Sequence, residues 1–249
     1  MYLEFLGTAG FHPSETRHTS CVFLPDAAPD AAFVLDAGSG FFRLTARPLP
    51  ARTHIFLSHP HLDHVMGLTF LLDVLYRNQT QVTIYGNAYT LRAVRSTLFG
   101  SPLFPLEFDY EAIEVSFERP TVVEGVEVTT CLLVHPGGSM AYRFRWPDDK
   151  TLCYVTDTAG ETNYYDFIGG APDVLIHERN FPDEFADLAR SSGHCTSAHL
   201  VAASRASRAR QVIATHFNPL TVSDPLREDD VYTTIPGVIG AVDCLKVEF

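Results

Sequence analysis

The sequence predicts a layered α/β fold in which helices pack on the outer sides of β-sheets. Apolar stretches of strand length recur along the chain, and segments with helical periodicity lie between several of them. The chain has 249 residues, of which 46% are hydrophobic, and this is enough for a substantial buried core. Because no internal repeat, low-complexity linker or charge block marks a boundary, we expect one domain over residues 1–249.

Strands make up most of the expected elements. Each stretch is short, rich in aliphatic, β-branched or aromatic residues, and bounded by polar residues, glycine or proline. The expected strands cover residues 2–6, 20–24, 32–35, 54–57, 81–85, 126–134, 140–145, 151–155, 174–177 and 211–215. Strands dominate the first part of the chain and alternate with helices towards its end, which favours a mixed α/β order.

Three segments have helical periodicity. Residues 64–77 are mostly apolar and end at an arginine that is followed by an asparagine, which predicts a largely buried helix. Residues 87–98 begin with an asparagine, a good N-cap residue, and stop before a glycine and two prolines. Residues 196–208 begin with a threonine, are rich in alanine and end with an arginine. We expect the last two helices to pack on the surface of a sheet.

Composition and charge exclude several classes of protein. The chain has 18 Lys and Arg against 30 Asp and Glu, a net charge of −12, and so lacks the basic excess of a general nucleic-acid binder. No apolar run approaches the ~20 residues of a membrane helix, and no basic segment precedes an apolar stretch at the start. The five cysteines contain no C-x-x-C pair, so we expect reduced thiols in a cytoplasmic protein.

The strongest chemical signal is a cluster of four possible metal ligands between an apolar stretch and the first helical segment. It consists of His59, His61, Asp63 and His64. Alternate side chains of an extended or turning backbone point the same way, so the first two histidines can share a metal while the last two residues face a neighbouring position. Capping and turn residues would explain any one of these positions, but four together favour a metal site.

Three further candidates follow other apolar runs: His135, Asp157 and His216. Residues just beyond strand ends collect at one edge of a sheet, where α/β proteins build their sites. Each of the three is a weak signal alone, because loop residues often occupy such positions. Together with the cluster they supply enough donors for two cations, a carboxylate between them and a water.

These residues resemble the metallo-β-lactamase superfamily, whose H-x-H-x-D-H motif is matched in full by the cluster that begins at His59. The later residues match the metal motifs of that family in order, and Asp36, with the glycine two residues on, matches its first motif. The resemblance extends from Leu6 to about Pro219. It implies an αββα sandwich of two mixed β-sheets with helices on the outer faces, a dinuclear metal centre at one edge, and an indirect supporting role for Asp36.

The resemblance also implies how the ligands are shared. It assigns one metal to His59, His61 and His135, the other to Asp63, His64 and His216, and a bridging place to Asp157. True β-lactamases have a cysteine at the bridging position, and the aspartate here speaks against a lactam substrate. Zinc suits the histidines best, while carboxylate-containing dinuclear sites also accept manganese or iron.

Within the superfamily the chain is similar to the branch of ribonuclease Z and cyclic phosphodiesterases. The opening glycine loop from Leu6 to Arg17, the His-Glu pair ending in Glu178, and the Gly-His-x-Thr segment around His194 carry this similarity. In that branch the late histidine acts on the phosphate and the glutamate orients it. His194 is thus expected to protonate the leaving alkoxide, Glu178 to fix its tautomer, and Asp63 to orient the attacking water as well as bind metal.

The spacing of the motifs bears on the substrate. Only 22 positions separate His135 from Asp157, which leaves no room for the long arm with which ribonuclease Z enzymes of the tRNA-processing kind grip tRNA. With the net charge of −12, this disfavours tRNA and favours a small or cyclic phosphodiester. The cysteine-based zinc site of the phosphoribosyl cyclic phosphodiesterase has no counterpart here, so the substrate is defined only as a class.

Other readings stay open. A hydrolase of thioesters or lactones, a ribonuclease Z-like RNA endonuclease, and a non-catalytic accessory protein of the same fold are the alternatives to a phosphodiesterase. The family resemblance also suggests a homodimer. We expect Arg17 and Arg179 to be ordinary surface cations rather than contacts of the phosphate.

Overall fold

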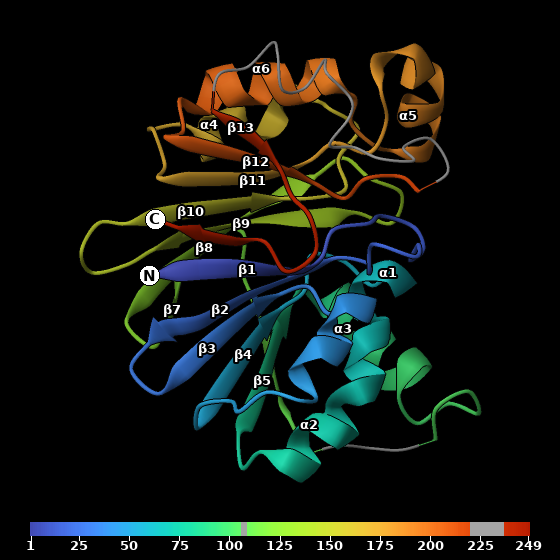
Figure 1. The fold of residues 1–249 in the computed structure, drawn as a ribbon, viewed down its shortest axis with the longest axis vertical. Coiled ribbons are helices and arrows are strands. Elements are labelled where there is room, and N and C mark those ends of the chain that lie inside the picture. The colour runs from blue at the N-terminus through green and yellow to red at the C-terminus, as the bar shows by residue number, and fades with distance from the viewer. Residues whose placement is uncertain (106–108, 220–236) are drawn as a thin grey trace. The chain divides into compact units, whose positions relative to one another are not determined.

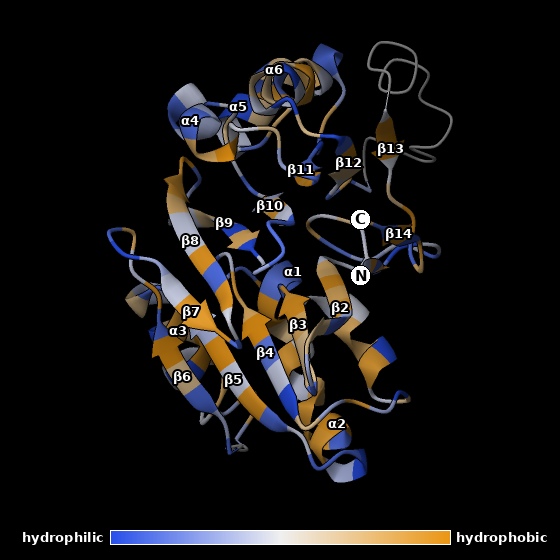
Figure 2. Ribbon diagram, turned by 90° about the vertical axis from the view of Figure 1, so that its left-hand side faces the viewer, coloured by the Kyte–Doolittle hydropathy of each residue, from blue (hydrophilic) through white to orange (hydrophobic). Residues whose placement is uncertain are grey.

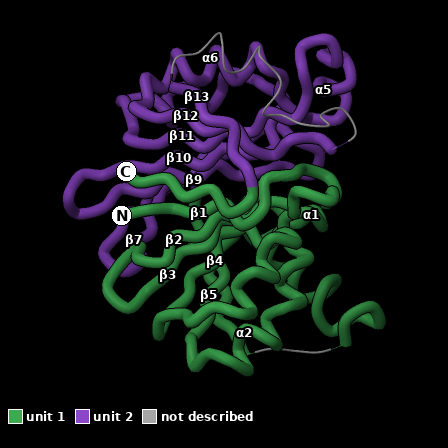
Figure 3. Tube along the Cα trace, viewed as in Figure 1, with its two compact units in different colours: residues 1–116, 243–248 green, residues 117–242, 249 purple. Residues whose placement is uncertain are grey.

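The structure is a computed structural model that describes residues 1–105, 109–219 and 237–249 (Figure 1). The chain divides into two compact units, Met1–Ser116 with Asp243–Glu248, and Phe117–Val242 with Phe249 (Figure 3). Each unit is built on one seven-stranded mixed sheet. The expectation of a single domain over the whole chain stays a prediction.

Unit 1 contains a sheet in the order β14-β1-β2-β3-β4-β5-β6. Its strands are β1 (Tyr2–Gly7), β2 (Cys21–Ala28), β3 (Ala31–Leu35), β4 (Arg52–Phe56), β5 (Gln81–Gly86), β6 (Glu111–Glu114) and β14 (Lys246–Glu248). The pairs from β14 to β3 are antiparallel, whereas β3 to β6 run parallel. Because β3 and β4 are parallel neighbours, the residues that follow them meet at one edge of the sheet.

Short helices cover this sheet. They are the 3₁₀ helix η1 (Ser39–Leu44), α1 (Leu62–Val65), η2 (Met66–Phe70), α2 (Leu71–Arg77), α3 (Ala88–Ala93) and the π-helical turn η3 (Val94–Leu98). Leu68, Leu71 and Val94 pack with the sheet residues Val34 and Ile55 in one buried cluster. The strands of this unit are accordingly rich in hydrophobic residues in Figure 2.

The long helix expected over residues 64–77 is wrong as a single element, because α1, η2 and α2 divide it. The break falls at Gly67, whose backbone N–H donates to the oxygen of Ala37 at 2.7 Å. A Cβ at this glycine would collide with the backbone oxygen of Gly38. The helix therefore tightens into a 3₁₀ turn to let two backbones approach, and only part of the segment is buried, with Tyr76 89% exposed.

Unit 2 contains a sheet in the order β13-β12-β11-β10-β9-β8-β7. Its strands are β7 (Thr121–Val123), β8 (Val126–Leu133), β9 (Ser139–Arg145), β10 (Thr151–Val155), β11 (Val174–Glu178), β12 (Gln211–Thr215) and β13 (Val238–Gly240). The neighbours from β10 to β13 are parallel and the remaining pairs antiparallel. The carboxyl ends of β10, β11 and β12 therefore share one edge.

The helices of unit 2 are η4 (Thr162–Tyr164), α4 (Tyr165–Ile168), η5 (Asp183–Phe185), α5 (Ala186–Ser192) and α6 (Ser197–Ser207). Leu200 and Ala203 of α6 pack with Leu175 and Val212 of the sheet in a buried cluster. The helix expected over residues 196–208 is confirmed as α6, with its N-cap at Thr196. The segment 87–98 is helical with its N-cap at Asn87, but it consists of α3 followed by the π-helical turn η3. Within the described residues, no helix is long and apolar enough to cross a membrane.

The predicted fold class is confirmed as two mixed sheets with helices. Each of the ten expected strands is present, with ends that differ by no more than a few residues. The sequence reading missed β6, β7, β13 and β14, which have three or four residues each. Such short strands have too few residues to show a period, and their pairing partners rather than their own composition define them.

Candidate metal and catalytic site

In unit 1, the candidate ligands are supported by a buried carboxylate. Asp36, directly after β3, is fully buried and accepts hydrogen bonds from the backbone N–H of Ser58 at 2.7 Å and from Nδ1 of His64 at 2.8 Å. The Ser58 hydroxyl also donates to this carboxylate, at 2.8 Å from Oδ2. Since Nδ1 of His64 must carry the proton to donate to a carboxylate, Nε2 is the ring atom with a lone pair.

His59 is oriented by the same network. It is fully buried after β4, and its Nδ1 lies 3.0 Å from the Ser58 hydroxyl. Because that hydroxyl already donates to Asp36, it acts as acceptor for the Nδ1–H of His59. The rings of His61 and His64 lie 4.4 Å and 4.3 Å from the ring of His59, centroid to centroid. The three imidazoles of the motif are thus adjacent, and two of them have a fixed tautomer.

Asp63 completes the group in unit 1. Its Oδ2 lies 3.4 Å from Nε2 of His64 and accepts the backbone N–H of Phe11 at 2.8 Å. His61 stands at the N-cap of α1 and is exposed, while the Asp63 side chain is 11% exposed. The motif therefore has an accessible side chain at His61 and buried, hydrogen-bonded side chains at His59 and His64.

In unit 2, three candidates follow the ends of strands. The Asp157 side chain is 2% exposed beyond β10 and accepts the hydroxyl of Thr156 at 2.6 Å. Nε2 of His135 lies 3.6 Å from Oδ2 of Asp157, and Nε2 of His216 lies 3.3 Å from its Oδ1. The Nδ1–H of His135 donates to the backbone oxygen of Gly193 at 2.8 Å, so its Nε2 also has a lone pair.

His216 is held differently from the other rings. The side-chain amide nitrogen of Asn180 donates to the backbone oxygen of His216 at 3.0 Å and lies 2.9 Å from its Nδ1. The amide oxygen of Asn180 accepts from Asn218 at 3.0 Å, so the nitrogen is the atom that faces the ring. In this arrangement the Nδ1 of His216 is an acceptor and Nε2 donates towards Asp157. Binding a cation through Nε2 requires the other tautomer of this ring.

Three of the site residues have a left-handed backbone. Asp36, Asp157 and His216 have φ of 56°, 53° and 60°. Asp36 and His216 directly follow a strand, and Asp157 stands two residues beyond the end of β10, where the chain turns at the sheet edge. Such a conformation is unfavourable for a residue with a Cβ and is retained where the surroundings fix it, often at functional sites.

Glu178 and His194 are brought together in unit 2, as the motifs predict. Oε2 of Glu178, the last residue of β11, lies 3.2 Å from Nδ1 of His194 and accepts the backbone N–H of Cys195 at 3.2 Å. Its Oε1 accepts the backbone N–H of Thr158. Glu178 is fully buried, whereas the His194 side chain is 16% exposed. A hydrogen-bonded carboxylate thus orients an accessible imidazole.

Asp157 lies beside this pair. One ligand atom of each of Asp157, His194 and His216 lies within 4.8 Å of those of the other two, a grouping able to hold a metal ion. His194, which we did not expect to be a ligand, therefore has the geometry of one as well as that of an acid.

The charges in unit 2 suit His135 as a metal ligand and Glu178 as the partner of His194. Burial lowers the pKa of His135, and the attraction of Asp157 offsets this only in part, so the ring is held neutral as a metal ligand requires. Burial by itself raises the pKa of Glu178, but the charge of His194 and its hydrogen bond outweigh burial and leave the pKa below its ordinary value. Glu178 is therefore ionised beside His194.

Both arginines differ from expectation, since neither is a surface cation. Arg17 is 8% exposed and donates to the Thr8 hydroxyl at 2.5 Å, which ties it to the glycine loop. Arg179 is fully buried after β11, and its Nε donates to the hydroxyl of Ser197 at 2.9 Å. Long-range packing that no local pattern reveals explains their burial.

Sequence reasoning missed two supporting residues. Ser58 links Asp36 to His59, and Asn180 contacts His216. The position of Ser58, directly before the H-x-H-x-D-H motif and after a strand, was the available signal for its role. Asn180 had none, because its contact bridges 36 residues of sequence.

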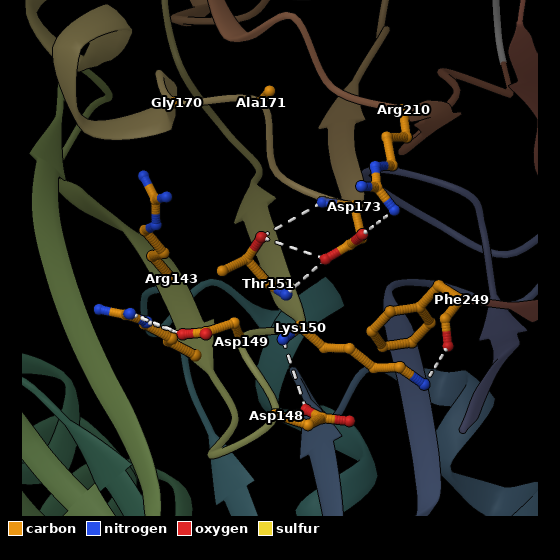
Figure 4. A pocket seen from close by; sticks show the side chains of 11 residues that line it. Arg143, Asp148, Asp149, Lys150, Thr151, Gly170, Ala171, Asp173, Arg210 and Phe249 are labelled. Carbon is orange, nitrogen blue, oxygen red and sulfur yellow. Dashed lines mark hydrogen bonds and ion pairs between the residues drawn. The ribbon is translucent and has the colours of Figure 1, made fainter.

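A pocket of about 560 Å³ lies in unit 2 near the first residues of β10 and β12 (Figure 4). It is strongly charged, but its four cationic side chains already have partners. These contacts join Arg145 to Asp149 (2.6 Å), Arg210 to Asp173 (3.1 Å), Lys150 to the backbone oxygen of Phe249 (2.9 Å), and Arg143 to the backbone oxygens of Phe167 (2.9 Å) and Gly169 (2.8 Å). This pocket is a set of mutually compensated charges rather than a candidate for catalysis.

Comparison with known proteins agrees with the motifs. The family model of the beta-lactamase superfamily domain matches residues 23–217, and the chain belongs to this superfamily. A ribonuclease Z of Synechococcus sp. (strain CC9311) is 27% identical over 319 aligned positions that cover 100% of this chain and 98% of the relative.

Solved structures share the fold. The metallo-beta-lactamase fold protein YhfI of Bacillus subtilis has a TM-score of 0.79 at 20% identity, covering 99% of this chain and 98% of that one. A diphosphatase from the PhnP family has a TM-score of 0.76 at 18% identity, covering 100% and 96% of the two chains. The chain therefore has the metallo-β-lactamase fold, and its relatives include ribonuclease Z.

Proposed function

We propose that the protein is a metal-dependent phosphodiesterase that hydrolyses a small or cyclic phosphodiester. The observation that carries this proposal is the pairing of His194 with Glu178 beside Asp157. An accessible imidazole held by a buried, ionised carboxylate suits proton donation to an oxygen leaving group. The similarity to ribonuclease Z and to a diphosphatase supports a phosphoric ester as the substrate class.

The donor set fits two divalent ions. In the proposed arrangement one ion would be held by His59, His61 and His135, the other by Asp63, His64 and His216, and Asp157 would contribute to both. On this proposal residues 1–249 would act as one domain. The fit rests on the chemistry of the donors, since the Nδ1 atoms of His59, His64 and His135 are engaged by acceptors and leave Nε2 for a cation. Two bound cations would supply charge stabilisation and a nucleophile at neutral pH.

The chain's own residues direct the proton transfers. Hydrolysis adds water to phosphorus and breaks one ester P–O bond, and the departing oxygen takes a proton. We assign that proton to Nε2 of His194, because Nδ1 is occupied by Glu178. Asp63 orients the attacking water through Oδ1, since its Oδ2 already accepts the N–H of Phe11.

The short interval from His135 to Asp157 supports a small substrate. It contains β9, two turns and β10, with no further element. The ribonuclease Z relative aligns over 319 positions against the 249 residues of this chain, so it contains residues without a counterpart here. An RNA endonuclease activity like that of this relative is the second candidate, and its full-length similarity is the observation that favours it.

The test begins with protein purified without added metal. We expect about two divalent ions per chain, zinc in the first place and otherwise manganese or iron, and hydrolysis of bis(p-nitrophenyl) phosphate and of cyclic nucleotides. Chelation is expected to abolish turnover, and Asp157→Ala to abolish both turnover and full metal loading. Two ions without phosphodiester turnover would contradict the proposal and direct the search to thioesters and lactones, or to an accessory role. A pre-tRNA substrate in the same assay tests the second candidate.

A further inference from the structure

An apolar groove of about 360 Å³ lies in unit 1 beside the H-x-H-x-D-H motif. Pro60 and Leu62, which alternate with the candidate ligands, line it together with Val65 of α1. Ala93 of α3, the π-helical turn η3 and Leu103 complete the lining. The volume is in the range of small-molecule sites, which is about 300 to 1,000 Å³.

The groove adjoins the candidate ligands through the chain itself. Leu62 stands between His61 and Asp63, and consecutive Cα atoms are about 3.8 Å apart. A group bound against Leu62 therefore lies beside the chain segment that carries two of the candidate ligands. A single substrate of modest size can occupy both places.

The lining is almost entirely hydrocarbon. Among its described side chains only Thr97 has a polar atom, and no aromatic ring is present on which a base could stack. A nucleobase or sugar in the groove would lose its hydrogen bonds to water and find almost no hydrogen-bonding partner instead, which weakens its binding. A nonpolar group has no such hydrogen bonds to lose. The groove therefore selects an alkyl or aryl group.

The exposure of the rim supports a transient occupant. Leu62 is 68% exposed and Leu103 is 92% exposed, so two large aliphatic side chains of the groove are open to contact with a bound molecule. Part of the lining comes from the π turn, which is closed by the backbone hydrogen bond from the N–H of Phe99 to the oxygen of Val94 at 2.9 Å. Such turns widen a helix and are frequent at functional sites.

From these observations we infer that the groove binds the nonpolar organic group of the substrate, so that the enzyme prefers phosphodiesters with an alkyl or aryl substituent. Leu62, Leu98 and Leu103 are the specificity-determining residues. This inference rests on the proposed function for the reacting ester, and it concerns the other end of the same molecule.

The first experiment uses p-nitrophenyl alkyl phosphates with methyl, butyl and hexyl groups, which keep the leaving group constant. We expect kcat/KM of the wild-type enzyme to rise about two- to fourfold per added methylene. Leu103→Ser should reduce the hexyl-to-methyl ratio about three- to tenfold. Leu72→Ser is the matched control, because Leu72 is a half-exposed leucine of α2 outside the groove, and this variant should keep the wild-type ratio.

The second experiment has a readout that needs no turnover. Metal-free protein with labelled leucine methyl groups is titrated with hexylphosphonate, which has no ester bond to hydrolyse. We expect saturable NMR shifts at Leu62, Leu98 and Leu103, and about threefold or greater weakening of binding in Leu103→Ser. Leu72→Ser should bind as the wild type does.

The two experiments separate the possible failures. Saturable shifts at the groove without hydrolysis of any phosphodiester would overturn the proposed function and support the groove as the site for a nonpolar group. Hydrolysis with equal kcat/KM for methyl and hexyl esters, and no shifts at the groove, would overturn the inference and leave the function standing. Shifts confined to leucines outside the groove would also overturn it.

Discussion

Nδ1 of His194 lies 3.2 Å from Oε2 of Glu178, and the same carboxylate oxygen accepts the backbone N–H of the next residue, Cys195. The carboxylate therefore fixes both the imidazole and the segment that carries it. A ring held at Nδ1 in this way presents Nε2 to a substrate.

Removal of this imidazole tests its role as an acid. His194→Ala is expected to lower kcat for an alkyl leaving group about 10²- to 10⁴-fold. A p-nitrophenolate leaving group needs little protonation, so its loss should be clearly smaller. Steady-state kinetics with both leaving groups, together with metal analysis, checks this. Equal losses for the two, or loss of metal in the variant, would contradict a role in proton donation and favour a ligand role.

Glu178→Gln tests whether the charge of Glu178 stabilises the protonated form of His194. The amide keeps the size of the side chain but removes the charge that stabilises the protonated ring, so the acid form of His194 is lost at lower pH. We expect the basic limb of the pH–kcat profile to move to lower pH, with a smaller loss of kcat than in His194→Ala. An unshifted profile would show that Glu178 does not act through this ring.

Asp36→Asn probes the network under the metal motif. The asparagine can accept only one of the two donors through oxygen, so Ser58 or His64 loses its partner in a fully buried place. We expect metal affinity to fall about 10- to 100-fold and the free energy of unfolding by about 1–3 kcal/mol. Competition with a chromophoric chelator and urea unfolding measure the two effects. Asp26→Asn, at an exposed position of β2, is the control.

The ion pair of Glu4 and Arg47 predicts an acid dependence of stability. Glu4 is 2% exposed, and Arg47 donates to both of its oxygens at 2.7 Å. The hydrogen bond from Arg47 lowers the pKa of Glu4 against the opposing effect of burial. Because the folded pKa lies below the ordinary value of 4.5, this stabilisation is present above that pH and is lost as pH falls through the folded pKa.

Glu4→Gln should therefore lose about 1–3 kcal/mol near neutral pH and show a shallower decline of unfolding free energy below about pH 4.5. Urea titrations at a series of pH values measure both. Asp149→Asn removes an exposed partner of Arg145 and should leave the acid dependence as in the wild type. Parallel curves for wild type and Glu4→Gln would contradict the assignment.

The packing around Gly67 leaves no room for a larger side chain at this position. An alanine there would strike the backbone oxygen of Gly38 and Cβ of Phe41, so we expect a loss of about 1–3 kcal/mol or more in unfolding free energy. Gly86→Ala is the matched control, because the added methyl would make ordinary contacts with Thr90 and Leu91. Thermal and urea unfolding compare the two variants, and similar stabilities would contradict the packing argument.

Strands and ligand motifs could be predicted from the sequence better than the residues that contact and position them. Strands such as β10 and β12 have local composition that defines them, and the motif from His59 is contiguous, so both were visible. Parallel strands then place Asp157 and His216 at one edge, as expected from their positions after apolar runs, and Glu178 at the end of β11 lies at the same edge. The break at Gly67 was not visible, because it results from contact with a backbone 29 residues earlier.

The same limit applies to side chains that act through space. The burial of Arg179 and the contact of Asn180 with His216 depend on which strands become neighbours. A local pattern contains no information about those neighbours. The preference for surface exposure of arginine is an average over proteins and gave the wrong expectation here.

The left-handed backbone at Asp36, Asp157 and His216 has a consequence for protein engineering. Glycine would relieve that conformation at Asp157 and His216, so a search for thermostable variants that is guided by heat resistance alone is expected to select it at these two places. Each such substitution would remove a side chain of the proposed metal site. At Asp36 glycine would instead leave the buried donors of Ser58 and His64 without an acceptor and lower the stability. At these positions a strained backbone coincides with side chains of the proposed site, so screens for thermostability need an activity criterion from their first round.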